Sequence, residues 1–160
     1  MKIAFEPIGI IHTPFKTREN MPIQPSGAKG IKGTIEINTE FVEGLKDLDG
    51  FSHIFLIYHF HKTDKEPNLT VKPFLDTESR GLFSTRAPNR PNNIGLSVVK
   101  LVNIDNNIIN IENVDIIDGT PLLDIKPYIP EFDEQSNVRA GWLKKAKNKV
   151  REKKSDNRFK

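Results

Sequence analysis

Two arginines and three asparagines crowd into one short stretch of the sequence, GLFSTRAPNRPNNIGLS at residues 81–97. Arg86 and Arg90 each carry a planar fork of donors that suits a carboxylate or a phosphate, and an arginine can also stack on a base. Pro88 and Pro91 restrict the neighbouring backbone, so the forks can be held in place at a lower cost in entropy. The pattern favours a binding loop. The alternative is a tight turn whose arginines pair with carboxylates of the body.

A second dense stretch, DIIDGTPLLDIKPYIP, covers residues 115–130. The run from Asp118 to Pro121 is typical of a turn, and apolar residues on both sides favour buried strands. The carboxylate of Asp118 could accept a hydrogen bond from a ligand, or it could cap the backbone of the turn. Both interpretations stay open from the residues alone.

Three histidines, His53, His59 and His61, have the same parity along one apolar run, so they are expected on one face of a strand. Imidazoles on one face can bind a metal. However, Phe55 and Ile57 lie between them on that face, and the run contains no carboxylate to orient the rings. We therefore expect histidines at a strand end that line a pocket, and no metal.

The absence of certain residues and motifs excludes several classes of function. The chain has no cysteine, which excludes disulfides and a cysteine nucleophile, and it contains no GxSxG, P-loop, HExxH or GxGxxG motif. No apolar run approaches the roughly 20 residues of a membrane span, and the N-terminus lacks the pattern of a signal peptide. We expect a cytoplasmic protein without a membrane partner.

Charge is distributed unevenly along the chain. Residues 139–160 contain ten Lys or Arg against two acids, whereas residues 1–138 contain 14 Lys or Arg against 19 acids. Val138, Trp142, Ala146 and Val150 recur every four residues, which predicts a basic C-terminal helix with a narrow apolar stripe. Such a tail could bind a phosphate backbone, or it could be a solvated end.

The elements that must position these residues are mainly β. Apolar or alternating runs predict strands at 5–11, 33–37, 51–61, 69–73, 94–104, 108–117 and 123–128. Asp105-Asn106-Asn107 predicts a hairpin turn, 39–45 a short helical turn, and 16–32 a long loop with functional character. Several short strands with regularly spaced turns favour a small single-domain β-barrel over residues 1–138, followed by a basic helix or tail over 139–160.

Four motifs resemble those of the TsaA-like family, also called TrmO: PIGIIHTPF at 7–15, LDGFSHIFLIYHFHKT at 48–63, the stretch at 81–97, and DGTPLLDIKPYIP at 118–130. The resemblance implies a β-barrel methyltransferase that binds S-adenosyl-L-methionine outside the Rossmann-like class and works as a homodimer. It implies methylation of N6 of threonylcarbamoyl-adenosine beside the anticodon of threonine tRNA. Compared with bacterial members, the chain corresponds to a short form without their extra C-terminal domain.

The resemblance also implies a donor pocket built from separate segments. Its expected residues are Met21, Pro22, Ile23, Phe60, His61, Arg86, Leu96, Ile116, Ile117, Asp118 and Gly119. The expected substrate-binding residues, toward RNA, are Arg90, Asn92, Lys126 and Tyr128.

Transfer of a methyl group to the N6 nitrogen requires a proton to leave, so a general base is useful. Asp118 and His61 are the catalytic candidates, with Tyr58 a weaker one. Three alternatives stay open at this point: a non-catalytic RNA-binding barrel, a methyltransferase for another acceptor, and a histidine-metal hydrolase.

Overall fold

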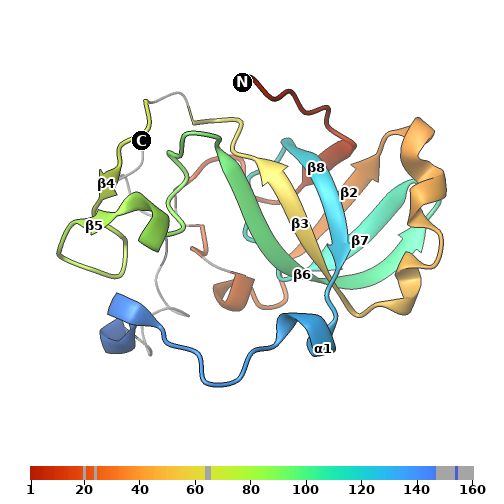
Figure 1. Cartoon of the computed structure of the whole chain (residues 1–160). Helices are drawn as coiled ribbons and strands as arrows, with labels where there is room; N and C mark the ends of the chain where they lie inside the picture. Colours follow the sequence, from red (N-terminus) through yellow and green to blue (C-terminus); the bar gives the residue numbers. More distant parts are fainter. Residues whose placement is uncertain (20, 24, 64–65, 147–153, 155–160) are drawn as a thin grey trace.

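A computed structural model describes residues 1–19, 21–23, 25–63, 66–146 and 154 of the chain. Six antiparallel strands close into a barrel in the order β1-β2-β7-β6-β3-β8 (Figure 1). The barrel strands are β1 (Gly9–His12), β2 (Lys32–Ile37), β3 (His53–His59), β6 (Ile94–Asp105), β7 (Ile108–Glu112) and β8 (Thr120–Pro127). The expected mainly β fold and barrel are confirmed.

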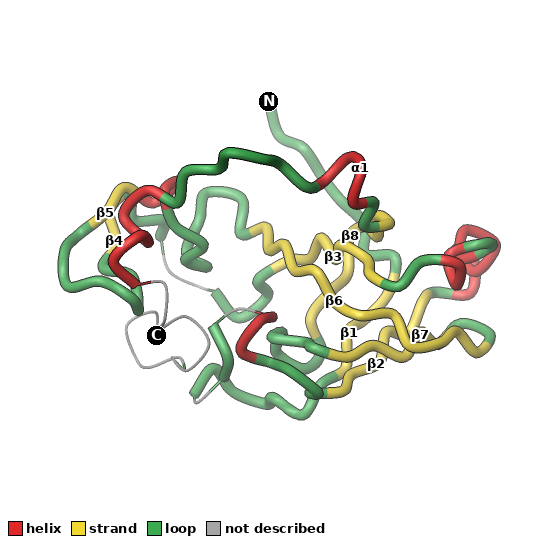
Figure 2. Tube along the Cα trace, turned by 90° about the horizontal axis from the view of Figure 1, so that it is seen from below, coloured by secondary structure: helices red, strands yellow, loops and turns green. Residues whose placement is uncertain are grey.

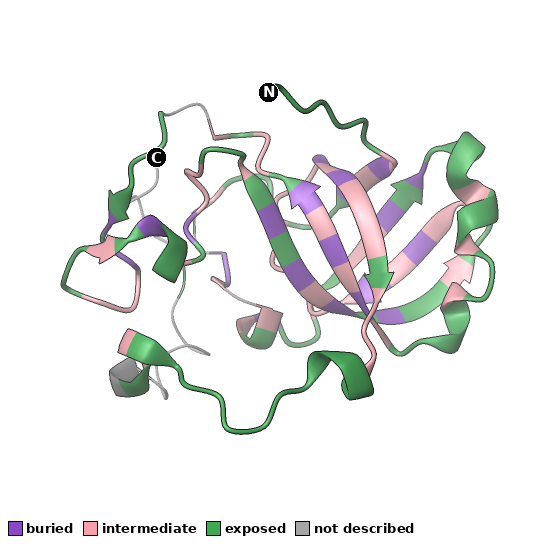
Figure 3. Cartoon of the chain, viewed as in Figure 1, coloured by how far each residue is buried: buried purple, intermediate pink, exposed green. Residues whose placement is uncertain are grey.

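The barrel core follows from the alternation of side chains along each strand. On β3, Ile54, Leu56 and Tyr58 are buried inside, while Phe55 and Ile57 lie on the outer face and are only partly buried (Figure 3). The interior is otherwise filled by branched aliphatic side chains from all six strands, including Ile11, Ile35, Val99, Ile109 and Leu122. Packing of β-branched residues from every strand explains why this sequence closes into a barrel.

The hairpin predicted at residues 105–107 is confirmed as the connection from β6 to β7. Asn106 adopts φ 54°, a left-handed conformation that asparagine tolerates better than most residues. Strand β7 ends earlier than the expected 117, because Asn113 also has a left-handed φ of 66° and breaks the alternation. The segment from 113 to 119 is thereby released from the sheet toward one end of the barrel.

A smaller unit stands beside the barrel. It contains a two-stranded sheet, β4 (Thr70–Val71) with β5 (Arg80–Gly81), followed by the 3-10 helix η4 (Leu82–Ser84). Val71, Leu82 and Ala87 form its own small buried cluster, with Phe74 packed against it. This cluster anchors the arginine-containing loop 85–93 next to the barrel strand β6.

The remaining elements are short. They are the 3-10 helices η1 (Pro25–Gly27), η2 (Thr39–Leu45), η3 (Leu48–Gly50) and η5 (Gly141–Ala146), and the helix α1 (Pro130–Asp133). The helical turn predicted at 39–45 is therefore confirmed in position and has 3-10 geometry. No helix among the described residues has the length and apolar character to cross a membrane.

The C-terminal segment is described only in part. After α1, the chain runs along the outside of the molecule from the barrel to the β4–β5 unit (Figure 2). Val138, the first residue of the predicted apolar stripe, is exposed, and within the described part of the predicted helix helical geometry is found only in η5 at 141–146. Val150 and most of the predicted basic helix lie outside the described residues.

Candidate functional site

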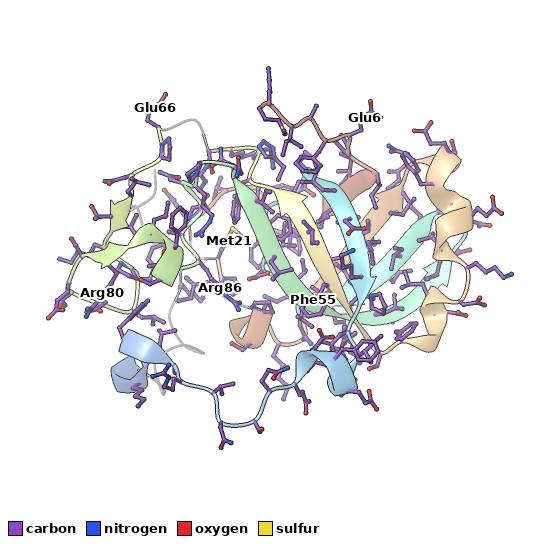
Figure 4. All side chains as sticks on the ribbon, in the orientation of Figure 1. Glu6, Met21, Phe55, Glu66, Arg80 and Arg86 are labelled. Atoms are coloured by element: carbon purple, nitrogen blue, oxygen red, sulfur yellow. The ribbon has the colours of Figure 1, made fainter. Side chains whose placement is uncertain are left out.

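A cavity of about 930 Å³ lies where the β3 and β6 end of the barrel faces the β4–β5 unit. Figure 4 shows Met21 and Arg86 in this region, between β6 and the smaller unit. The cavity brings together ten of the residues expected in the site: Met21, Pro22, Ile23, Phe60, His61, Arg86, Arg90, Leu96, Ile116 and Ile117. Its volume falls within the range of about 300–1,000 Å³ that is usual for small-molecule sites.

The two arginines of the loop have different surroundings. Nη1 of Arg90 donates to the carbonyl oxygens of Thr85 (3.1 Å) and Ala87 (3.3 Å), so this guanidinium braces its own loop. It also lies over the ring of Phe83, 5.8 Å from the ring centroid. The side chain of Arg86 is exposed at the cavity wall. Both arginines line the cavity, and Arg90 also stabilises the loop that carries Arg86.

Asn93 connects this loop to the end of β3. Its Oδ1 accepts the backbone N–H of Arg90 (3.1 Å), and its carbonyl oxygen accepts the backbone N–H of Phe60 (2.8 Å). Asn93 has φ 43°, which an asparagine tolerates. Because of these contacts, the loop and the residues following β3 are held as two walls of one cavity.

His61 lies two residues beyond β3 and lines the cavity. Its Nδ1 is 3.3 Å from Oγ1 of Thr120. The same hydroxyl of Thr120 donates to the carbonyl oxygen of Ile117 (2.6 Å). Burial, followed by the charge of Lys62, lowers the pKa of His61 below its ordinary value of 6.5. The imidazole is therefore mainly neutral near pH 7 and can accept a proton.

His53 and His59 have different positions from His61. Both belong to the outer face of β3, where His53 contacts Ser52 Oγ (2.9 Å) and packs edge-on against Tyr128. Within the described residues, no group of three or more His, Cys, Asp or Glu side chains is arranged to hold a metal ion.

Asp118 is engaged by the loop that follows β1. Its Oδ2 lies 2.6 Å from Nζ of Lys16, and its Oδ1 accepts the backbone N–H of Thr13 (3.0 Å). The hydrogen bond from Lys16, followed by that from Thr13, lowers the pKa of Asp118. Its side chain lines a second hollow together with His12. The backbone N–H of the next residue, Gly119, donates to the carbonyl oxygen of Ile11 (2.9 Å). These contacts fix the turn beside the cavity.

Met21 and Pro22 are buried, although they belong to the long loop between β1 and β2. Pro22 forms an isolated antiparallel bridge with Lys154, so the C-terminal segment reaches this loop. On the other side of the cavity, Nε1 of Trp142 donates to the carbonyl oxygen of Ser84 (2.9 Å). Trp142 itself lines the cavity, which places part of the basic tail in its wall.

The remaining expected substrate residues lie elsewhere. Asn92 is exposed in the turn before β6. Lys126 pairs with Asp124 (2.9 Å), and Tyr128 packs against the ring of Phe55, with ring centroids 5.6 Å apart. Phe55 is near the start of β3, and the four residue steps from Phe55 to the last strand residue, His59, correspond to about 13 Å of extended strand. Lys126 and Tyr128 are thus at the opposite end of β3 from the cavity.

The sequence reasoning missed Asp115 and Ser97. Ser97 is 2% exposed and its Oγ donates to Oδ1 of Asp115 (2.8 Å), while the hydroxyl of Tyr58 lies 3.1 Å from the same Oγ. Burial raises the pKa of Asp115 to about 6, and burial followed by the Asp115 charge raises the pKa of Tyr58. The available signal was an acid enclosed by apolar neighbours in the sequence NVDII, which is unusual for a solvated carboxylate.

The walls of the cavity combine apolar and charged surface. Phe60, Leu96 and Ile116 supply apolar surface from the strands and from the segment after β7. The ionisable side chains among the described lining residues are Arg18, Lys62, Arg86 and Arg90, with His61, Tyr58 and the single carboxylate of Asp115. This combination of apolar and charged side chains fits an amphipathic, charged small molecule with an aromatic part.

Comparisons with known proteins assign this architecture. The family model described as the tRNA-methyltransferase O N-terminal domain matches residues 10–134. A probable S-adenosyl-L-methionine-binding protein from Pyrococcus abyssi is 57% identical over 99% of this chain and 86% of its own length. A tRNA (adenine(37)-N6)-methyltransferase from Homo sapiens is 37% identical over 83% of this chain and 32% of its own length. The crystal structure of TrmO from Pseudomonas aeruginosa matches with a TM-score of 0.75 and 36% identity, covering 89% of this chain and 63% of that one.

A closed six-stranded barrel with a charged cavity at one end is therefore the scaffold of a class of S-adenosyl-L-methionine-dependent methyltransferases. The chain belongs to the tRNA-methyltransferase O family. It spans less than two thirds of the Pseudomonas structure and about a third of the human relative.

Proposed function

We propose that this protein methylates tRNA with S-adenosyl-L-methionine as the donor, and that its acceptor is N6 of threonylcarbamoyl-adenosine beside the anticodon. The observation that carries the proposal is the cavity, where residues of four distant segments meet at one end of a barrel of the tRNA-methyltransferase O family. Relatives from Mus musculus and Homo sapiens, both 37% identical, are named tRNA (adenine(37)-N6)-methyltransferases, which supports the choice of acceptor.

The residues present suit the donor. Apolar walls at Phe60, Leu96 and Ile116 suit its adenosine part, and Arg86 offers a guanidinium to its carboxylate. When bound, S-adenosyl-L-methionine supplies an electrophilic methyl group on a cationic sulfur. The protein contributes chiefly by holding donor and acceptor in line, because a direct transfer requires no covalent bond to the enzyme.

His61 is the general base in this proposal. It lines the cavity and is mainly neutral near pH 7, so its imidazole can take the proton that the acceptor nitrogen loses. Asp118, the other candidate, is bound to Lys16 and Thr13 and faces the second hollow. We therefore assign Asp118 to positioning the turn that follows Ile117.

The remaining parts of the proposal concern assembly. Phe83, Ile94 and Leu96 line the cavity and are 74%, 38% and 50% exposed, which is more apolar surface than a solvated rim requires. We propose that a second copy of the chain covers this rim in a homodimer. We also propose that the basic tail contacts RNA and that the protein acts in the cytoplasm. Light scattering coupled to gel filtration tests the dimer, which a monomeric mass would refute.

Methylation in vitro tests the proposed reaction. Purified protein is incubated with labelled donor and with threonine tRNA that either carries or lacks the threonylcarbamoyl group. We expect methylated nucleoside only from the modified tRNA. Product should be lost in His61→Asn but not in Asp124→Asn, a half-buried carboxylate on β8. Equal methylation of both tRNAs would refute the acceptor, and no methylation of either would refute the reaction.

A further inference from the structure

The cavity contains one carboxylate that the proposed reaction leaves without a role. Asp115 lies in the segment between β7 and β8 and lines the cavity together with Tyr58. Asp115 is the single carboxylate among the described lining residues, which include the cationic side chains of Arg18, Lys62, Arg86 and Arg90, and the charge of Arg86 acts on it. A carboxylate in this cavity offers a cationic ligand a partner of opposite charge.

The carboxylate of Asp115 is held from within the barrel. Ser97 Oγ donates to its Oδ1 at 2.8 Å and lies 3.1 Å from the hydroxyl of Tyr58. Ser97 and Tyr58 are 2% and 6% exposed, so this chain of hydroxyls belongs to the packed core. Tyr58 packs edge-on against Phe60, with ring centroids 5.4 Å apart.

We propose that Asp115 is the counter-charge of the cationic methyl donor, and that Ser97, itself hydrogen-bonded to Tyr58, orients this carboxylate toward the cation. The donor has two positive centres, the sulfonium and the α-ammonium, and a carboxylate can pair with either. The inference rests on the donor of the proposed function and is independent of the RNA acceptor.

The proposal has a consequence for pH. Burial raises the pKa of Asp115 to about 6, despite the hydrogen bond from Ser97 and the charge of Arg86. A bound cation favours the ionised form and lowers this pKa, so binding near or below pH 6 releases a proton. Donor affinity therefore falls as pH decreases through about 6. His61, which also lines the cavity, gains charge only below its lowered pKa.

Isothermal calorimetry with S-adenosyl-L-methionine tests the proposal between pH 5 and 8, in buffers with different ionisation heats. We expect Asp115→Asn to weaken binding at pH 7.5 by about tenfold to a hundredfold and to remove the proton release at pH 6. Asp124→Asn removes the same charge from a half-buried position on β8 outside the cavity lining and is expected to change neither. His61→Asn is expected to keep the proton release.

The Ser97→Ala variant distinguishes a role of Ser97 in orienting the Asp115 carboxylate from a role in packing alone. Since the hydroxyl of Ser97 stabilises the ionised carboxylate, its loss raises the pKa of Asp115 and moves the pH midpoint of donor binding upward. A structural role alone would lower the melting temperature without moving that midpoint. S-Adenosylhomocysteine, which has the ammonium but no sulfonium, locates the charge: an effect of Asp115→Asn on the donor alone assigns the sulfonium, and an equal effect on both ligands assigns the ammonium.

Two results would overturn the proposal. The first is a folded Asp115→Asn protein with wild-type affinity and pH dependence. The second needs no variant: wild-type protein that binds the donor without releasing a proton at pH 6. Failure of the proposed function is distinguishable, because in that case the wild-type protein would give no binding heat with S-adenosyl-L-methionine at any pH.

Discussion

Replacing Gly95 with alanine tests whether Tyr58 is held as the structure indicates. Gly95 lies directly opposite Tyr58 in the β3–β6 ladder, and a Cβ built on Gly95 would overlap the tyrosine ring. The ring cannot move freely, because its hydroxyl is 3.1 Å from Ser97 Oγ and its edge packs on Phe60. A glycine within a strand is otherwise unfavourable, so the covering aromatic ring explains the presence of Gly95 near the start of β6.

The expected size of the effect follows from overpacking a buried site. Forcing one carbon into a packed interior typically costs about 1–3 kcal/mol. For a chain of this length, about 2–4 °C is lost per kcal/mol, which predicts a melting temperature lower by roughly 2–12 °C. Since the displaced ring also moves away from Ser97, donor affinity should fall together with stability.

Calorimetric melting and donor titration of Gly95→Ala provide the assay. Gly44→Ala is the matched control, because nothing lies within 4 Å of a Cβ built at Gly44 and its φ is not positive. In a Tyr58→Leu background the Gly95→Ala substitution should cost much less, since the overlapping ring is gone. Unchanged melting temperature and affinity in Gly95→Ala would refute this account of the Tyr58 position.

Three further predictions concern the cavity. Arg86→Ala should weaken donor binding by about tenfold or more. Arg90→Ala should lower both donor affinity and stability, because it removes the two hydrogen bonds that brace the loop; titration and melting of each variant check this. At saturating donor, the methylation rate should fall as pH decreases through the lowered pKa of His61 and its imidazole becomes protonated, and a flat rate–pH profile would contradict its role as base. Truncation after residue 146 removes seven Lys or Arg and should weaken both RNA binding and its salt dependence. Trp142→Ala should instead weaken donor binding, because Trp142 lines the cavity. Gel-shift assays across salt concentrations should therefore show a change for the truncation and none for Trp142→Ala.

Much of the barrel could be predicted from the sequence because its signal is local. The alternation along β3 and the asparagine turn between β6 and β7 are encoded by neighbouring residues. Strand ends were less predictable: β7 ends at Glu112, where the left-handed Asn113 interrupts an apolar run that continues to Ile117. Such an interruption depends on the backbone contacts of Asn113, whose N–H bonds to Ile31 O at 2.8 Å.

The site was less predictable, because its contacts join residues distant in the sequence. Asp115 and Ser97 meet only once β6 and the segment after β7 are placed side by side. The loop motif indicated two ligand-binding arginines, yet the guanidinium of Arg90 turns back to the carbonyls of Thr85 and Ala87. Residue type could not distinguish these two roles, since both are arginines of the same proline-containing loop.

Nucleoside mass spectrometry of tRNA from cells with and without this protein tests the central claim most directly. We predict that methylated threonylcarbamoyl-adenosine is present in wild-type cells, absent when the protein is removed, and restored by the wild-type chain but not by Arg86→Ala. The unmethylated nucleoside should accumulate in its place. An unchanged level of the methylated nucleoside in cells without the protein would contradict the assigned reaction.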